Sequence, residues 1–528
     1  MALSVGLLCF GATAAFADTT IRVNPKQGSD VVKAVQKKLD KAHKKATAKN
    51  KYIIKVKPGA YKLGGTLKLY SNTTLDLTGV KLKATKKTSN MIKVGDTPQD
   101  KKKGYAYKNI SIVGGDIDNA GHSSTAIVIG HAKNVKLSGV AVHNSKNAHL
   151  VEVAGTNGFT ADGCTFYDQV QTKKAKVATP EAIQIDILVK KHMKTYRSEV
   201  LPMKKIVVKN CTFRNVPRGV GSHTAVLNSP VSNVKIQNNT FTDCKSGAIQ
   251  VLNYENCVIE NNVINNSPRG IVSYTVNKKG VFLAKTLSKE GKVKTKVSSK
   301  YKKPKANQKI VIRGNTISLA GTDIYAEAEN EGIFVGGFDF KKALKKNAST
   351  DAIPKGNYYA SGITIVDNTI TTIGHGIRLS DARNATITGN NIAFQSAGSK
   401  AGDFYGIQLT NASTNNVVTG NSIANPRTNG IFLLGNSSAA RIDGNTIANA
   451  GKYGIGLQGS TATSIANNKV DKAKECGISV IKSSTAGAIT GNTLLSTGSY
   501  GVYAKNNSKV RSCSGNTVVG ANRPVFIQ

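Results

Sequence analysis

The sequence lacks several features that define whole classes of protein. Of its 528 residues none is tryptophan, 12 are proline and only 30 are acidic, against 73 lysines and arginines. No apolar run of about 18 residues follows the N-terminus, which excludes a transmembrane helix there. The hydrophobic share of 39% is enough to bury a core, whereas disordered chains combine low hydrophobicity with high net charge. The sequence therefore predicts a folded chain with no transmembrane segment.

The chain is also poor in cysteine. It has seven, and none of the six that follow Cys9 forms a close metal-type pair, which excludes a disulfide-dense scaffold and leaves no metal ligands to assign. Cys164 and Cys211 occupy equivalent places in DGCTF and KNCTF, and we expect them to be stacked, buried thiols. Residues 1–17 are mostly apolar and end in Ala-Phe-Ala, which is typical of a signal peptide. We expect residues 18–528 to form one secreted domain.

A repeat with a period near 23 residues determines the expected fold. Each unit contains short β-branched runs bounded by Gly and Asn turns, too short for helices. Such units cannot bury an apolar face alone, but stacked units share one core. The sequence thus predicts an all-β, single-stranded right-handed parallel β-helix in which Asn supplies αL turns and amide ladders. The recurring asparagines are Asn239, Asn262, Asn315, Asn368, Asn390, Asn421, Asn445, Asn468, Asn492 and Asn516.

Other segments depart from the repeat. Residues 29–47 place apolar side chains at helical spacing after Ser29 or Asp30 as N-cap, and this amphipathic helix is expected to cap the open end of the solenoid. Long insertions interrupt the coils, and the first two, at 168–180 and 188–204, could wall a groove. Their approximate ranges are 168–180, 188–204, 278–309 and 338–358.

The order of these segments resembles that of a known superfamily. A helix, then IKVKPGAYKL, LYSNTTLDL and GGDIDNAG, then coils of the GNTI type, resembles the exported β-helix proteins of the pectate lyase and polygalacturonase superfamily. That resemblance covers nearly the whole mature chain. It implies the fold, and it implies chemistry on the outer strand face with carboxylates, a histidine and a basic residue. The superfamily contains hydrolases, lyases, epimerases, binding modules and phage tailspikes, so the fold alone does not choose between them.

Five segments align in register on that outer face. In each, the second and fourth residues point into the core and the others point outward. Asp186 then lies beside His223, and Glu152 lies diagonally about 8 Å from Asp186, a spacing suited to inverting glycoside hydrolysis. We predict Asp186, Glu152, His223 and Glu181 as catalytic residues, although an inert polar face would look similar. The segments are 150–154, 182–186, 219–223, 248–252 and 270–274.

The same columns supply the predicted substrate-binding residues. Arg218 and Arg269 each follow a proline in a Pro-Arg-Gly turn, and a guanidinium there can bind a sugar carboxylate through two hydrogen bonds. Gln184, Gln250 and Tyr274 complete this set. The paired Asp-Asp and the Arg-Ile-Lys of the superfamily are absent from this sequence. Asp186 and His223 therefore match the superfamily only by neighbourhood and residue type.

The sequence Gly374-His375-Gly376 has the letters of the polygalacturonase Gly-His-Gly. It occupies a place that other coils fill with x-Gly-Ile, such as Tyr405-Gly-Ile and Tyr453-Gly-Ile. We therefore attribute it to the repeat.

The charge is unevenly distributed along the chain. The formal net charge is +43, of which residues 361–528 carry +8, and residues 278–309 contain twelve lysines and one glutamate. No nucleic-acid-reading module accompanies this charge, so we expect no nucleic-acid partner. An extracellular polyanion fits better: an acidic polysaccharide or the anionic cell wall.

Three functions are compatible with this sequence. The first, which we favour, is hydrolysis of an acidic, uronate-containing polysaccharide on the outer strand face. The second is lyase chemistry by β-elimination on the same face, which would bring Ca²⁺ as cofactor, although acidic residues are few. The third is a non-catalytic surface protein that binds anionic glycans or cell wall.

Overall fold

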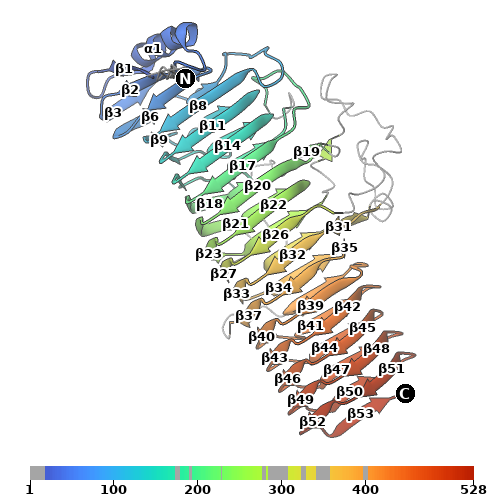
Figure 1. Cartoon of the computed structure of the whole chain (residues 1–528). Coiled ribbons are helices and arrows are strands. Elements are labelled where there is room, and N and C mark those ends of the chain that lie inside the picture. Colours follow the sequence, from blue (N-terminus) through green and yellow to red (C-terminus); the bar gives the residue numbers. More distant parts are fainter. Residues whose placement is uncertain are drawn as a thin grey trace, which may run out of the picture.

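The structure is a computed structural model, and it describes residues 18–172, 179–188, 193–226, 229–275, 281–282, 307–322, 329–339, 357–395 and 402–528. These residues form a long solenoid of parallel strands with helix α1 (Val32–Lys45) at its N-terminal end (Figure 1). The expected signal peptide, residues 1–17, and most of the insertions at 278–309 and 338–358 lie outside the described residues.

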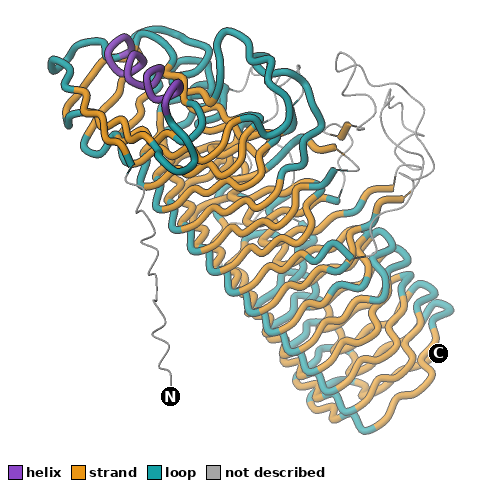
Figure 2. Tube along the Cα trace, turned by 45° about the horizontal axis from the view of Figure 1, so that its top comes forward, coloured by secondary structure: helices purple, strands orange, loops and turns teal. Residues whose placement is uncertain are grey.

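Each coil places its strands on up to three faces, separated by short turns (Figure 2). The first face is a 17-stranded parallel sheet. Its strands, in order along the solenoid, are β1 (Thr19–Val23), β2 (Tyr52–Val56), β5 (Thr73–Asp76), β8 (Tyr107–Val113), β11 (Ala132–Ser138), β14 (Thr156–Asp162), β17 (Lys204–Lys209), β20 (Val231–Gln237), β22 (Tyr254–Glu260), β26 (Ile310–Arg313), β32 (Ile363–Val366), β36 (Thr386–Thr388), β39 (Asn416–Thr419), β42 (Ser438–Asp443), β45 (Thr461–Ala466), β48 (Thr485–Thr490) and β51 (Lys509–Ser514).

The second and third faces belong to one 30-stranded sheet, because β18 (Thr212–Gly221) and β21 (Thr240–Leu252) continue around the corner between them. The other strands of the second face are β3 (Gly59–Leu63), β6 (Val80–Ala84), β9 (Asp116–Asp118), β12 (Ala141–His143), β15 (Thr165–Tyr167), β23 (Val263–Ser267), β27 (Thr316–Leu319), β33 (Thr369–Thr372), β37 (Asn391–Phe394), β40 (Ser422–Ala424), β43 (Thr446–Ala448), β46 (Lys469–Asp471), β49 (Thr493–Leu495) and β52 (Thr517–Val519).

The third face carries the candidate site. Its strands are β4 (Leu67–Leu69), β7 (Ile92–Val94), β10 (Ile127–Ile129), β13 (Val151–Ala154), β16 (Glu181–Asp186), the ends of β18 and β21, β24 (Arg269–Tyr274), β28 (Glu331–Gly336), β34 (His375–Ser380), β38 (Ile407–Thr410), β41 (Ile431–Leu434), β44 (Tyr453–Gln458), β47 (Cys476–Ile481), β50 (Tyr500–Ala504) and β53 (Arg523–Ile527). Three two-stranded pairs lie outside the faces: β19 (Ala225–Val226) with β25 (Val281–Phe282), β29 (Phe338–Asp339) with β30 (Asn357–Tyr358), and β31 (Ala360–Ser361) with β35 (Ala382–Arg383).

Alternation along the strands builds the core. In β6 the side chains of Val80, Leu82 and Ala84 are buried, and those of Lys81 and Lys83 are exposed. Stacking places each inward residue against its equivalent in the next coil, so one apolar column runs through the solenoid. Burying a Val, Leu or Ile side chain completely contributes about 1.5–3 kcal/mol. This gain outweighs the cost of placing Gly and Asn, which have low strand propensity, between the strands. The predicted parallel β-helix is therefore confirmed.

The asparagine ladder is confirmed, with one difference. From Asn239 to Asn516, each side-chain NH₂ donates to the Oδ1 of the next ladder asparagine at 2.8–2.9 Å. The αL turn residue is the one before each ladder asparagine, for example Gly444 with φ 63° before Asn445. The ladder asparagine itself is buried, as at Asn445. Its Nδ2 donates to the carbonyl of Val418, and its backbone N–H donates to Oδ1 of Asn468, so buried backbone groups at the turn are paired.

Helix α1 covers the N-terminal end of the solenoid, as predicted, but is shorter than the expected range 29–47. Its buried residues Val35, Leu39 and Ala42 lie on one side and its lysines on the other. The N-cap position is Val31, and the Asp30 carboxylate still accepts a hydrogen bond from the N–H of Val32 at 2.9 Å.

The cysteines in the described residues are free thiols. Cys164 and Cys211 are buried on adjacent coils, where the backbone N–H of Cys164 donates to Sγ of Cys211 at 3.4 Å. The predicted stack of buried thiols is confirmed.

Candidate functional site

The predicted register of the third face is confirmed by the strand pairing. Glu152 pairs with Gln184, Gln184 with Gly221, Gly221 with Gln250, and Gln250 with Val272. Because the pleat period is two residues, the outward column follows directly from this register. The prediction differs at its end: β18 stops at Gly221, so His223 is not part of a strand.

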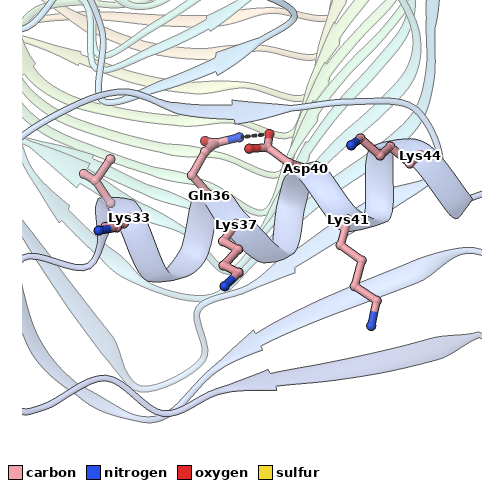
Figure 3. A pocket seen from close by; sticks show the side chains of 7 residues that line it. Lys33, Gln36, Lys37, Asp40, Lys41 and Lys44 are labelled. Carbon is pink, nitrogen blue, oxygen red and sulfur yellow. Dashed lines mark hydrogen bonds between the residues drawn. The ribbon is translucent and has the colours of Figure 1, made fainter.

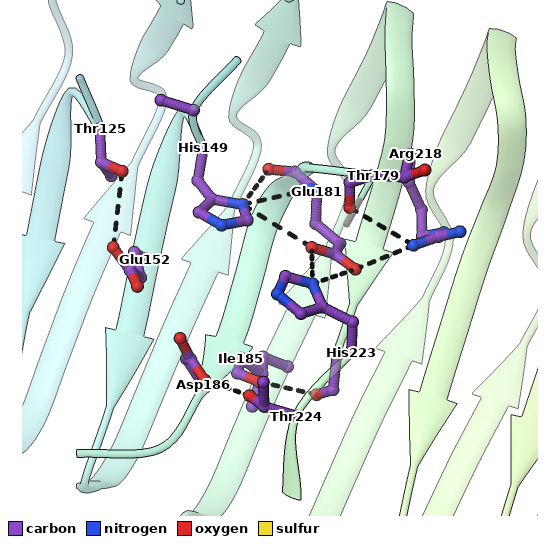
Figure 4. Close-up of polar contacts among 12 residues, drawn as sticks. Thr125, His149, Glu152, Thr179, Glu181, Ile185, Asp186, Arg218, His223 and Thr224 are labelled. Carbon is purple, nitrogen blue, oxygen red and sulfur yellow. Dashed lines mark hydrogen bonds and ion pairs between the residues drawn. The ribbon is translucent and has the colours of Figure 1, made fainter. Parts of the chain in front are cut away.

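A buried carboxylate, Glu181, connects three coils (Figure 4). Its Oε1 accepts a hydrogen bond from Nη1 of Arg218 at 3.1 Å, and its Oε2 lies 3.0 Å from Nδ1 of His223 and 3.7 Å from Nδ1 of His149. The sequence did not determine the direction of Glu181, because it begins its strand. Arg218 is itself buried and also contacts the carbonyl of Thr179 at 3.5 Å.

Electrostatics keeps this cluster charged. Burial opposes ionisation of Glu181, but the charge and hydrogen bond of His223 and the charges of Arg218 and His149 outweigh burial and hold the pKa of Glu181 at about 2. Burial also opposes the charge of His223, yet the Glu181 carboxylate raises the pKa of His223 overall. For His149 burial prevails and lowers the pKa. The folded chain therefore favours an ionised Glu181 beside a charged His223.

Acid is expected to remove the stability that this cluster contributes. The folded pKa of Glu181, about 2, lies below its ordinary value of 4.5, so the contribution is complete above pH 4.5 and is lost as the pH falls towards 2. The urea midpoint measured from pH 7 to pH 2 should therefore fall less steeply in Glu181→Gln than in the wild type. Some dependence of the urea midpoint on pH should remain in the variant, because the pKa of Glu329 is also about 2 in the folded chain. An unchanged slope in Glu181→Gln would contradict this assignment.

The predicted catalytic residues Glu152 and Asp186 lie close enough to influence one another. Burial, then the charge of Asp186 and a hydrogen bond with it, raises the pKa of Glu152 well above its usual range. The register places Glu152 diagonally from Asp186, as expected, because Ala154, two residues after Glu152, pairs with Asp186. Thr224, rather than a strand-paired His223, donates to Asp186 through its hydroxyl.

The insertion after β16 covers this pair. Leu188, Met193 and Tyr196 form an apolar cluster with Val128 and Ala154 outside the main core. The backbone of residues 195–197 hydrogen-bonds to Asp100, which anchors the segment across the N-terminal coils. Glu152 is 8% exposed and Asp186 2% exposed. The insertion thus forms a cover over the carboxyl pair, where the sequence suggested a groove wall.

The predicted substrate-binding residues take different positions. Gln184 is buried, and neither of its amide atoms has a hydrogen-bond partner among the described residues. Nε2 of Gln250 donates to the carbonyl of Ser222 at 3.2 Å. Arg269 is buried in an ion pair with Glu331 at 3.1 Å and lies 3.5 Å from the hydroxyl of Tyr274. As with Arg218, the structure directs this guanidinium to a neighbouring carboxylate.

A second charged cluster continues from Arg269 along the third face. Nη1 of Arg378 contacts Glu329 at 2.7 Å and Glu331 at 3.2 Å, and Nε2 of His375 lies 3.3 Å from Glu329. The Glu329 side chain is 62% exposed, so this cluster reaches the surface. His375 is the histidine of the Gly-His-Gly sequence, and its strand position is indeed that of the x-Gly-Ile repeat.

Aromatic side chains extend this second cluster along the solenoid. The ring centroids of Tyr274 and Phe334 are 5.3 Å apart, and those of Tyr405 and Phe432 are 4.9 Å apart. The His375 ring stacks on that of Tyr405 with centroids 5.5 Å apart. We call Tyr274, Phe334, His375, Arg378, Glu329, Tyr405 and Phe432 the aromatic strip.

A shallow hollow lies along the outer side of α1 (Figure 3). Within it, Gln36 donates to Asp40 at 2.8 Å and also bonds the backbone N–H of Lys68. The remaining lining residues, apart from Val32, are the lysines Lys33, Lys37, Lys41 and Lys44. This end of the solenoid is therefore basic.

Sequence reasoning missed His149, Glu329, Glu331 and Arg378. His149 precedes β13 in a turn, so no strand register predicted it. Glu331 and Arg378 belong to x-Gly-Ile strands, and Glu329 precedes one, so the repeat does not single out any of the three. Among the described residues, no helix has the length and apolar character needed to cross a membrane.

Comparison with protein families and curated proteins identifies the repeat. A family model described as "Right handed beta helix region" matches residues 196–338 and 356–521. Plasmin and fibronectin-binding protein A of Streptococcus pneumoniae (strain ATCC BAA-255 / R6) is 24% identical over 189 residues, which cover 31% of this chain and 26% of that protein. The chain thus aligns with about a quarter of this relative.

Solved structures that are similar to this chain include an adhesin and a phage protein. The surface adhesin PfbA of Streptococcus pneumoniae is 17% identical, with a TM-score of 0.48 and coverage of 86% of this chain and 91% of that chain. A mutant tailspike protein of E. coli bacteriophage HK620, in complex with a pentasaccharide, is 13% identical, with a TM-score of 0.50 and coverage of 92% and 78%. At 13% identity the likeness to the tailspike shows the fold alone.

Proposed function

We propose, from the premise that this chain belongs to the right-handed β-helix family, that it is an extracellular protein that binds acidic polysaccharide along its third face. Two similar proteins, a plasmin- and fibronectin-binding protein and a tailspike bound to a pentasaccharide, are both compatible with an extracellular location. A net charge of +43 attracts polyanions, including anionic cell-wall polymers.

The aromatic strip is the observation that carries this proposal. Its rings are buried except that of Tyr274, which is half-buried, and they lie beside the Arg378 guanidinium and the exposed Glu329 on consecutive coils. Sugar rings pack their C–H faces against aromatic side chains, and a guanidinium binds a uronate carboxylate. Tyr274, Arg378 and Glu329 reach the surface, whereas the Glu152–Asp186 pair is buried beneath the insertion, which disfavours direct contact with a polymer in this conformation.

Binding to a glycan panel tests this function. We expect uronate-containing polysaccharides to bind and neutral ones to bind far less, with affinity falling as salt rises. Tyr274→Ala and Arg378→Gln should each weaken binding about ten-fold, which corresponds to ~1.4 kcal/mol. Arg313→Gln, which changes a surface arginine on the first face, is the matched control. Equal affinity for neutral glycans, or an equal loss in the control, would contradict the proposal.

Hydrolysis at Glu152 and Asp186 is a second candidate function. One observation favours it: Glu152 has a pKa raised well above its usual range, and a protonated carboxyl group is what general acid catalysis requires. The covering insertion would have to move aside first. Incubation with the same panel separates the cases, because hydrolysis yields reducing ends alone and β-elimination also yields an unsaturated sugar that absorbs in the ultraviolet. If neither product forms with any glycan, both catalytic candidates fail and the binding function stands.

A further inference from the structure

Three potential metal ligands converge from three successive coils. Nδ1 of His149, Oε2 of Glu181 and Nδ1 of His223 lie within 4.8 Å of one another, with Oε2 at 3.0 Å from His223 and 3.7 Å from His149. Bonds of about 2.0–2.2 Å at a tetrahedral angle hold two zinc ligands about 3.3 Å apart. The observed distances lie on both sides of that value. We propose that His149, Glu181 and His223 bind a divalent transition-metal ion such as Zn²⁺.

The surroundings of Glu181 orient it for this role. Arg218 holds Oε1 at 3.1 Å, which turns Oε2 towards the two imidazoles. Arg218 is fixed in turn by Ser246 at 3.2 Å. Such outer hydrogen bonds, which set the direction of a ligating carboxylate, accompany most metal sites in proteins. Arg218 is therefore a positioning residue in this proposal.

The two imidazoles determine which ions the proposed site prefers and leave it accessible from the outer face. Their rings lie roughly parallel with centroids 5.8 Å apart, and both present Nδ1 to the same carboxylate oxygen. Nitrogen ligands favour Zn²⁺ and its neighbours over Ca²⁺. The side chains of His149 and His223 are 15% and 18% exposed, so an ion can enter from the outer face. Binding replaces the present contact of His149 Nδ1 with the Glu181 N–H at 3.2 Å.

Three protein ligands leave one tetrahedral position open. Structural zinc sites use four protein ligands, whereas sites that hold a water or a substrate group use three. The proposed site would therefore bind one further small ligand through the ion, on the same face as Glu152 and Asp186. This property is independent of glycan binding at the aromatic strip.

Zinc titration of the full chain without an affinity tag, after treatment with a chelator, tests the proposal. Calorimetry should show one Zn²⁺ per chain, and Co²⁺ should give the visible absorption bands of a tetrahedral nitrogen and oxygen site. His149→Gln and His223→Gln should each weaken Zn²⁺ binding at least about ten-fold. His375→Gln is the matched control, because His375 is also buried beside a carboxylate but lies outside this cluster.

Several results would overturn the proposal. They are the absence of Zn²⁺ binding, unchanged binding in both histidine variants, an equal loss in His375→Gln, or Ca²⁺ binding as tight as Zn²⁺ binding. Circular dichroism establishes that each variant is folded. Should the variants misfold, anomalous diffraction from wild-type crystals grown with Zn²⁺ decides: a peak between His149, Glu181 and His223 supports the site, and a peak elsewhere or none refutes it.

Discussion

Replacing Arg218 with alanine is expected to lower the free energy of unfolding by about 3–5 kcal/mol, because removing one partner leaves a buried charge uncompensated. The guanidinium is buried against Glu181 and also donates to Thr179 and Ser246, so several polar groups lose a partner together. Urea denaturation followed by circular dichroism measures the change.

Two further variants establish the cause. The double variant Arg218→Ala with Glu181→Gln should recover part of the loss, since the carboxylate that needed the guanidinium is then gone. Arg313→Ala breaks a surface pair with Glu260, in which the Arg313 side chain is 57% exposed, and should cost less than about 1 kcal/mol. An Arg218 variant as stable as the Arg313 variant would show that the buried pair contributes little.

Removing one rung of the asparagine ladder should have a comparably large effect. Asn445 donates to Asn468 at 2.9 Å and to the carbonyl of Val418 at 3.0 Å, and accepts from the backbone and side chain of Asn421 at 3.0 and 2.9 Å. Asn445→Ala leaves at least two buried polar groups unpaired, at about 1–3 kcal/mol each, so we expect a loss of about 2–6 kcal/mol. Thermal and urea unfolding measure it.

The ladder supplies its own controls. Asn449→Gly removes a similar amide bond, to Asn425 at 2.8 Å, on the exposed side of the same coil, and glycine keeps the φ of 55° without strain. That variant should cost little. Asn516 ends the ladder in the described chain and is only partly buried, so Asn516→Ala should cost less than Asn445→Ala. Equal losses at Asn445 and Asn449 would mean that burial does not set the effect.

The repeat made the fold and the register predictable. The x-Gly-Ile and Asn-Thr patterns recur at coil spacing, and a shift of one residue would turn every buried Ile outward. That constraint is local and repeated in each coil. The pairing of Glu152 with Gln184 and of Gln250 with Val272 could therefore be predicted from the sequence.

The site was less predictable, because its residues interact outside the strand register. Glu181 begins β16, His149 precedes β13 and His223 follows β18, so their directions depend on turns. The insertion after β16 also has no repeat to specify its path. Only its contacts, such as Tyr196 packed beside Val128 and Ala154, show that it covers the carboxyl pair.

The charged residues also separate what the sequence predicts from what only the structure shows. Composition alone showed an excess of lysine and few carboxylates, and favoured an anionic partner outside the cell. It did not show that Glu181 and Glu331 are buried against Arg218 and Arg269, which removes both arginines from the surface. Near these pairs it is Arg378, with a side chain 26% exposed, that reaches the surface of the third face.

The sequence by itself determined that this chain is a parallel β-helix with a capping helix, an asparagine ladder and outward polar columns, because those features follow from a period that each coil repeats. Only the tertiary structure decided which polar residues meet. Contacts such as Glu181 with His149, His223 and Arg218 join residues from different coils through turns and corners, and an ion pair forms there only when packing brings the side chains within a few ångströms.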